Sequence, residues 1–296
     1  MLIGTNKQAS KAMRQRDSNA EDVKQHVKHA TSQAVAHPWF AYLARYGYAA
    51  KGIVYLLAGS LSARAAFGLG GQTVDKSEAL LAVVGGSIGQ LMLVLIAFGL
   101  LGYVLLRFVQ ALLDPERKGS DAKGMAIRGG YLISGLVYAG LALSALQLAI
   151  GSDGDQGDSL QQRVAWVFGL PLGRWVVAAI GLVLIGVGLS QIYRAYSADF
   201  SEHLRWADMS AGERMASQRL GQAGLAARGI VIGLIGGFAV QAALAFDASK
   251  VQESGGALQA LAEPLGPSAV VIVAAGLAAY GLYMLVVAWY GRIVTH

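Results

Sequence analysis

Long runs without a charged residue dominate the pattern of hydrophobic and polar positions in this 296-residue chain. A helix needs about 20 predominantly apolar residues to cross the hydrocarbon core of a bilayer. The runs that meet or approach this length, once their aromatic and small flanking residues are counted, are 79–106, 129–152, 175–193, 229–246 and 264–291. Each run therefore predicts a membrane-spanning helix.

The segment 46–67 predicts a further span, although charge interrupts it. Lys51 lies near one end of the segment and Arg64 near the other. Long basic side chains at these places can extend to the two opposite headgroup layers. We therefore expect an all-α membrane protein with six transmembrane helices.

Residues 45–59, RYGYAAKGIVYLLAG, are the first of three related stretches, which we call the repeat motifs. Arg45, Tyr48, Gly52, Val54 and Tyr55 recur with identical spacing as Arg128, Tyr131, Gly135, Val137 and Tyr138. Gly47, Lys51, Gly52, Val54 and Gly59 align in the same way, without gaps, with Gly224, Arg228, Gly229, Val231 and Gly236. The second helices align too: Gly99 and Tyr103 correspond to Gly276 and Tyr280, and Gly99 and Arg107 correspond to Gly186 and Arg194. The chain thus contains three tandem two-helix units.

Each unit has two spans, so every unit begins and ends on the same side of the membrane. Repeats of this kind are parallel and are related by rotation about the membrane normal, which predicts an approximate threefold arrangement. We divide the chain into a polar, basic segment at 1–38, repeat 1 at 39–118, repeat 2 at 119–199, and 200–296, where a linker helix precedes repeat 3.

Short helices are expected between the spans. Amphipathic segments occupy the loop inside each unit, at 75–84, 158–168 and 253–261. In the connection before repeat 3, the spacing of Ser210 and Glu213 matches a capping box and predicts the start of a surface helix.

The positions shared by the three repeat motifs form one face of a helix, because 45, 48, 52, 55 and 59 are spaced by three and four residues. Small residues on such a face allow helix backbones to approach closely in lipid. The predicted helix-packing residues are Gly52, Gly59, Gly135, Gly229, Gly233 and Gly236.

The same motifs carry the candidate ligand-binding residues Arg45, Tyr48, Tyr55, Arg128, Tyr131 and Tyr138. In one interpretation the tyrosines line a central polar path and the basic residues surround an anionic site. In the other, the tyrosines are hydrogen-bonded core residues, because a hydroxyl within a membrane needs a partner. The basic residues then mark the cytoplasmic helix ends and contact lipid headgroups.

Composition and charge agree with a membrane location and give an orientation. Apolar residues make up 55% of the chain, charged residues 14%, and the mean hydropathy is +0.48. With a cytoplasmic amino terminus, 19 of the 24 Lys and Arg residues lie inside and five outside, namely Arg64, Lys76, Arg163, Arg174 and Lys250. This bias follows the positive-inside rule and places both termini in the cytoplasm. It also accounts for the net charge of +6 without a nucleic-acid partner.

Catalytic and metal-binding patterns are weak. Residues 85–89 match G-x-S-x-G with Ser87 as the nucleophile, but no strand precedes them and all five histidines fall on the other side of the membrane. The chain has no cysteine, and its grouped histidines and aspartates lack the spacing of metal sites. No Asp or Glu falls within a predicted span, which argues against a proton pump. We therefore expect no enzyme activity, no metal and no cofactor.

The three repeat motifs and two of the second helices resemble a bacterial membrane family described as domain of unknown function 1206. The resemblance rests on RYGYAAKGIVYLLAG, RGGYLISGLVYAGLA and GLAARGIVIGLIG, together with GLLGYVLLRFVQA and GLAAYGLYMLVVA. It extends over residues 40–291, and the third motif departs from it because Leu225 and Ile232 replace both tyrosines. The resemblance implies six spans in a bacterial inner or plasma membrane, and it implies no activity.

The leading functional expectation is a non-enzymatic membrane protein that binds or passes a small or lipid-like ligand. The alternative is a structural or lipid-binding accessory protein, or a scaffold, whose helical core is closed and transports nothing. Membrane lipids are the expected partners in both cases, and an unidentified protein partner or an oligomer is compatible with either.

Overall fold

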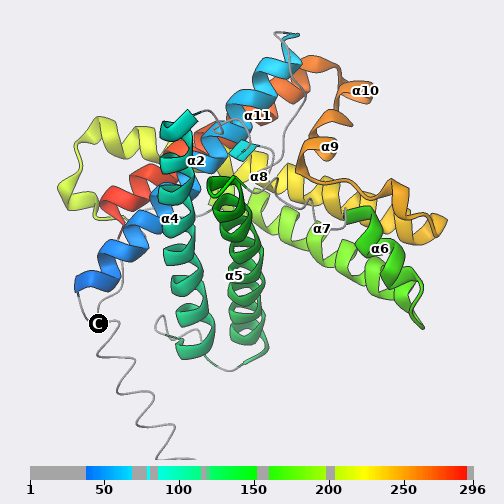
Figure 1. Cartoon of the computed structure of the whole chain (residues 1–296). Coiled ribbons are helices and arrows are strands. Elements are labelled where there is room, and N and C mark those ends of the chain that lie inside the picture. The colour runs from blue at the N-terminus through cyan, green and yellow to red at the C-terminus, as the bar shows by residue number, and fades with distance from the viewer. Residues whose placement is uncertain are drawn as a thin grey trace, which may run out of the picture.

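The computed structural model describes residues 38–68, 79–80, 86–114, 119, 121–151, 160–197 and 204–291. Within these residues the protein is helical, without a β-strand, and Leu204 forms an isolated antiparallel bridge with Gly291. The long helices (Figure 1) are α2 (Pro38–Ala66), α4 (Gly86–Leu113), α5 (Ala122–Ala149), α7 (Gly173–Ser197), α8 (Ala211–Ala245) and α11 (Pro267–Tyr290). The short elements are α6 (Leu160–Phe168), η2 (Trp206–Asp208), η3 (Ala248–Lys250), α9 (Ser254–Gln259) and α10 (Ala262–Leu265).

Five of the long helices are long and apolar enough to cross a membrane: Gly89–Leu112 of α4, and all of α5, α7, α8 and α11. α2 has 29 residues but is less apolar, since it carries Arg45, Lys51 and Arg64. The all-helical, multi-pass class expected from the sequence is confirmed. By length and composition, the described residues contain five candidate spans instead of the six expected.

Two of the short helices lie where the sequence predicted amphipathic segments. α6 and α9 lie in the loops of repeats 2 and 3, where amphipathic segments were predicted. The helix expected at 75–84 lies outside the described residues except for 79–80, and the polar segment 1–38 lies outside them except for Pro38. The linker helix expected before repeat 3 is not separate from the span that follows it, because α8 runs without a break over 35 residues.

The capping box predicted at the start of α8 is confirmed. The Ser210 hydroxyl accepts from the Glu213 amide at 3.3 Å, and the Glu213 carboxylate accepts from the Ser210 amide at 2.7 Å. The Tyr290 hydroxyl also donates to Glu213 at 2.9 Å. The first turn of α8 is therefore connected to the last turn of α11.

We expect Ser210→Ala to destabilise the start of α8 by about 1 kcal/mol, because the amide of residue 213 loses its acceptor. Hydrogen exchange of the amides in the first two turns of α8 measures this effect, and these amides should exchange faster. Ser144→Ala is the control, since the Ser144 hydroxyl only donates back to the Gly140 carbonyl within its own helix. Equal exchange in the two variants would contradict a stabilising role for the cap.

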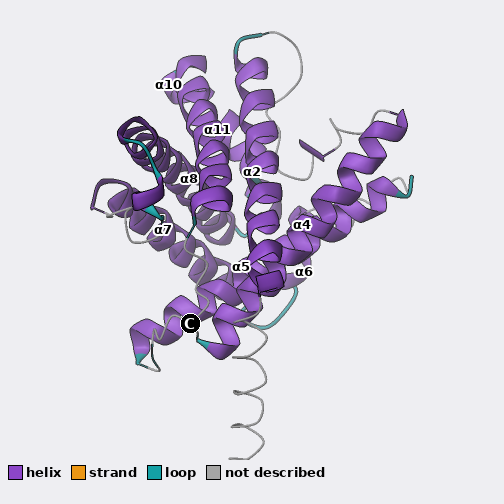
Figure 2. Ribbon diagram, turned by 90° about the vertical axis from the view of Figure 1, so that its left-hand side faces the viewer, coloured by secondary structure: helices purple, strands orange, loops and turns teal. Residues whose placement is uncertain are grey.

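Each long helix packs along a main partner that belongs to another repeat. The three closest pairs are α2 with α11, α4 with α5, and α7 with α8 (Figures 1 and 2). Helices of one repeat contact each other less extensively, as α2 does with α4 and α8 with α11. The two helices of repeat 2, α5 and α7, do not pack along one another and diverge in Figure 1.

Glycine backbones form the closest contacts between the paired helices. A Cβ added at Gly52 would lie 2.8 Å from the Gly281 carbonyl oxygen, and one at Gly59 would lie 2.6 Å from the Ala278 nitrogen. In the α7–α8 pair, a Cβ at Gly229 would lie 2.7 Å from the Gly188 carbonyl oxygen. Neighbouring backbone blocks a side chain at each of these positions, as expected for helices that associate in lipid.

The other predicted packing glycines have different surroundings. Gly236 is in the same type of contact, since its Cβ would lie 2.6 Å from the Gly181 carbonyl oxygen. A Cβ at Gly135 would make an ordinary contact of 3.4 Å with Arg107. A Cβ at Gly233 would meet nothing within 4 Å, although the Gly233 backbone lies against Gly188.

Candidate functional site

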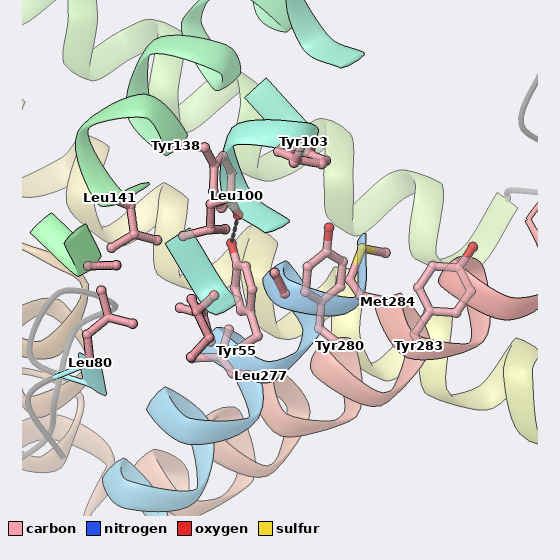
Figure 3. Close-up of a cluster of buried hydrophobic side chains, with 14 of the residues drawn as sticks. Tyr55, Leu80, Leu100, Tyr103, Tyr138, Leu141, Leu277, Tyr280, Tyr283 and Met284 are labelled. Atoms are coloured by element: carbon pink, nitrogen blue, oxygen red, sulfur yellow. Dashed lines mark hydrogen bonds between the residues drawn. The ribbon is translucent and has the colours of Figure 1, made fainter. Parts of the chain in front are cut away.

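Tyrosine rings from α2, α4, α5 and α11 meet in the interior of the protein (Figure 3). The ring centroids of Tyr103 and Tyr138 lie 4.8 Å apart, edge to face. Those of Tyr55 and Tyr280 lie 4.7 Å apart in the same geometry. Tyr48 approaches Tyr103 at 5.5 Å, again edge to face. We call these five residues the tyrosine cluster.

The cluster follows from helical spacing and from the pairing of the helices. Tyr48 and Tyr55 lie seven residues apart on α2, so both point from one face of that helix. The Tyr138 hydroxyl donates to the Tyr55 hydroxyl at 3.4 Å, which links α5 to α2. Each edge-to-face pair contributes about 0.5–1.5 kcal/mol beyond its buried area. The cluster therefore connects four helices from all three repeats.

Lys51 is buried inside this cluster, with 2% of its surface exposed. Its Nζ donates to the Tyr103 hydroxyl at 2.9 Å. The same nitrogen lies 4.5, 5.0 and 5.5 Å from the ring centroids of Tyr103, Tyr138 and Tyr280. The expectation that Lys51 extends to a headgroup layer is wrong, because tyrosines on neighbouring helices give its ammonium an acceptor and aromatic faces in the interior.

Arg107 of α4 reaches the same tyrosine hydroxyl. Its Nε donates to Tyr103 at 2.7 Å, and its Nη1 donates to Gln110 Oε1 at 2.8 Å. The guanidinium carbon lies 4.8 Å from the Tyr103 ring centroid and 4.9 Å from that of Tyr131. One phenol oxygen thus accepts hydrogen bonds from two cations, Lys51 and Arg107.

Arg228 of α8 brings a third cation to the cluster. Its Nη1 donates to the Tyr280 hydroxyl at 3.3 Å, and its guanidinium carbon lies 5.3 Å from the Tyr280 ring centroid. The Nε of Arg228 is buried and has no hydrogen-bond partner among the described residues. Arg228 therefore keeps a buried donor that faces no protein acceptor there.

The bonds from Lys51 to Tyr103 and from Arg228 to Tyr280 occupy equivalent positions in two repeats. The bond from Lys51 to Tyr103 joins the helices of repeat 1, and the aligned positions of repeat 3 form the bond from Arg228 to Tyr280. We call this repeated contact the cation–tyrosine pair. In repeat 2, serine occupies both positions.

Within the described helices that form it, the site carries positive charge without a nearby carboxylate. α2, α4, α5 and α11 contain no Asp or Glu, and the acid of α8, Glu213, lies in its first turn. Lys51, Arg107 and Arg228 are hydrogen-bonded to tyrosine and glutamine instead. Buried charges without a counter-charge destabilise a protein by several kcal/mol. The site is therefore electrostatically complementary to an anion.

The two predicted candidate arginines differ in their surroundings. Arg45 lies three residues before Tyr48 on α2, and its Nε is buried without a hydrogen-bond partner among the described residues. Arg128 donates to the carbonyl oxygens of Ala111 and Leu112 at 2.7 and 3.1 Å. These carbonyls end α4 and lack helical partners. Arg128 therefore caps α4 and contacts that helix end instead of the tyrosine cluster.

The structure adds residues that the sequence did not single out as site residues, above all Tyr103 and Tyr280. A signal for both was present in the sequence, since a basic residue and a tyrosine lie 52 positions apart in both repeat 1 and repeat 3. Among the described residues, no group of three or more His, Asp or Glu side chains could hold a metal ion.

The chain is similar to a known family and to a bacterial relative. The family described as Domain of Unknown Function (DUF1206) matches it three times, at residues 46–114, 129–198 and 223–291. The uncharacterized protein YxxB of Bacillus subtilis (strain 168) is 33% identical over 247 residues, which cover 83% of this chain and 89% of the relative. No solved structure matches significantly. The chain belongs to the DUF1206 family, with three tandem copies of its repeat.

Proposed function

We propose that this protein is a non-enzymatic membrane protein that binds an anionic ligand, small or lipid-like, at the tyrosine cluster. The observation that carries the proposal is the meeting of Lys51 and Arg107 at one phenol oxygen, with Arg228 beside them and no carboxylate in the surrounding helices. An anion at this place would offset charges whose burial otherwise costs free energy. Arginine and lysine are also the usual protein partners of phosphate and carboxylate groups.

The proposed membrane arrangement keeps six spans, an approximate threefold relation of the repeats and cytoplasmic termini. α2 is included because its 29 residues are long enough and because Lys51 is covered by tyrosine instead of lipid. The cyclic pairing of α2 with α11, α4 with α5 and α7 with α8 supports the relation between repeats. The positive-inside bias of Lys and Arg supports the orientation.

Binding is favoured over passage because the tyrosine rings fill the space between the helices. Four of the five cluster rings are buried, and they contact one another edge to face. The alternative is an accessory protein or scaffold in which the cations serve only to join helices. In that case the charges stabilise the fold without exchange of a ligand.

The test is the thermal stability of the purified protein in a neutral detergent with added anions. Inorganic phosphate is the soluble probe, and phosphatidylglycerol is compared with zwitterionic phosphatidylcholine as the lipid probe. A ligand at 100 times its Kd stabilises a protein by about 2.7 kcal/mol. We expect an anion to raise the midpoint of unfolding, and Lys51→Met to abolish this rise.

The matched control is Lys250→Met, which removes an exposed lysine far from the tyrosine cluster in sequence and should keep the full response. Without an anion, Lys51→Met should be at least as stable as the unchanged protein, because one of three like charges is removed. If neither probe stabilises the unchanged protein, or if Lys51→Met responds equally, the proposal fails. Loss of stability in Lys51→Met without any anion effect would favour the scaffold.

A further inference from the structure

Repeats 1 and 3 pack their own two helices together in the same way. A Cβ at Gly99 would collide with the Ala50 side chain, and one at the aligned Gly276 would collide with that of Ala227. These contacts lie next to the cation–tyrosine pair. The intra-repeat interface is therefore a reproducible feature of the fold.

Repeat 2 has the corresponding residues but leaves them without a helix partner. The valine of the repeat motif is buried in repeats 1 and 3, where Val54 is 0% and Val231 4% exposed, whereas Val137 is 57% exposed. On the second helix, Tyr283 is 7% exposed but its repeat-2 equivalent, Tyr193, is 72% exposed. The same positions thus face the outside in repeat 2.

Repeat 2 therefore has one helix face without a partner on α5 and another on α7. Their positions correspond to the two faces that pack together in repeats 1 and 3. The open face of α5 consists of the exposed residues Gly130, Ile133 and Val137 and the half-buried Ser134. The open face of α7 consists of four exposed residues, Val183, Gly186, Ser190 and Tyr193. A Cβ at Gly130 or Gly186 would meet nothing within 4 Å. In repeats 1 and 3, the residues equivalent to these two glycines contact the facing helix. Both halves of the interface are present in repeat 2, and they are separated.

In repeat 2, the two positions of the cation–tyrosine pair carry residues that suit a close helix contact. Ser134 and Ser190 replace both members of the cation–tyrosine pair together. Two serines fit a close helix contact in lipid, where hydroxyls bond across helices and small residues allow approach. Within one chain the Ser190 hydroxyl donates to the Val187 carbonyl of its own helix at 2.8 Å, so this small side chain is satisfied and leaves room for a neighbouring helix. The joint change keeps both faces small enough for a close helix contact.

Within one chain the faces are held apart by other pairings. α5 packs along α4, and α7 packs along α8 through Gly181 and Gly188. A second copy of the chain can supply both missing partners at once. In a twofold arrangement about the membrane normal, α5 of each copy meets α7 of the other, and both contacts keep the antiparallel direction found in repeats 1 and 3.

We propose that the open faces of α5 and α7 form a homodimer interface, in which each copy completes repeat 2 of its partner. Cysteine cross-linking tests this directly, since the chain has no cysteine of its own. A chain with Ser134→Cys is co-expressed with a differently tagged chain with Ser190→Cys, and membranes are oxidised. We expect a disulfide-linked dimer that carries both tags.

In the matched control, the first chain carries Leu136→Cys instead of Ser134→Cys. Leu136 lies at a similar depth on α5 but on another exposed part of the helix, so this pair should give little cross-linking. Equal cross-linking of both variants would overturn the proposal. A chain with both cysteines separates the alternatives. A disulfide within that single chain would show that repeat 2 closes on itself, and no disulfide in either experiment would show that lipid covers the faces.

A second measurement uses the mass of the protein in nanodiscs. Gly186→Leu should convert a dimer into a monomer, because the leucine blocks approach of the partner while a Cβ there meets nothing within its own chain. Gly237→Leu, at a glycine on α8 that is equally unobstructed, should remain dimeric. A monomeric unchanged protein, or a dimeric Gly186→Leu variant, would overturn the proposal.

Discussion

Gly52→Leu is expected to lower the free energy of unfolding by about 3 kcal/mol, the upper end of what overpacking usually costs. A Cβ at Gly52 would lie 2.8 Å from the Gly281 carbonyl oxygen, and one at Gly281 would lie 2.6 Å from the Gly52 carbonyl oxygen. The obstruction is backbone on both sides, so no rotamer change relieves it. α2 and α11 would have to move apart along their contact. This separation would also disturb the packing of the Tyr55 ring of α2 against the Tyr280 ring of α11.

The effect is measured by titrating the protein from a mild detergent into sodium dodecyl sulfate and following loss of helix packing by tyrosine absorbance or proteolysis. The control is Gly140→Leu on α5, where a Cβ would meet nothing within 4 Å. Both substitutions raise helix propensity by about 1 kcal/mol, so the control separates propensity from packing. A Gly52→Leu protein as stable as the control would contradict the close approach of α2 and α11.

Tyr103→Phe is expected to destabilise the protein by about 3 kcal/mol, since hydrogen bonds to charged groups contribute about 1.5–3 kcal/mol each. The substitution keeps the ring but removes the oxygen that accepts from Lys51 at 2.9 Å and from Arg107 at 2.7 Å. Two buried cations would then lose their shared acceptor. The equivalent change in repeat 3, Tyr280→Phe, removes a single longer bond of 3.3 Å from Arg228 and should cost about 1 kcal/mol.

The same denaturation assay ranks the two tyrosine variants. Addition of Lys51→Met to Tyr103→Phe should restore part of the lost stability, because it removes one of the unpaired charges. A double-mutant cycle then gives the coupling between the two residues. Tyr103→Phe and Tyr280→Phe proteins of equal stability, or a purely additive cycle, would show that the phenol oxygen does not hold both cations.

Much of the helical framework could be predicted because membrane helices follow from local rules. Runs of uncharged residues and small-residue spacing predicted the spans, and α4, α5, α7, α8 and α11 meet the criteria of length and composition. The weaker prediction was α2, whose basic residues lower its apolar character. The start of α8 could be derived from Ser210 and Glu213, since a capping box depends on residues three positions apart.

The candidate site was only partly predictable, because its contacts join residues far apart in the chain. Helical spacing placed Tyr48 and Tyr55 on one face of α2, and both belong to the tyrosine cluster. Spacing alone could not show that Tyr103 lies across from Lys51, so the lysine was assigned to the membrane surface. Spacing also grouped Arg128 with the site, whereas this side chain satisfies carbonyls at the end of α4.

The sequence by itself determined the repeat, the helices and the positions where backbones can approach, because these depend on composition and on spacing within a helix. Only the tertiary structure decided which helices pair. Gly52 of repeat 1 meets Gly281 of repeat 3, and one phenol oxygen serves two cations from different helices. The tertiary structure also separated α5 from α7, although their residues repeat a contact made in repeats 1 and 3. Helix association in lipid depends on close steric fit and on polar partners between helices, and neither is contained in the pattern of a single helix.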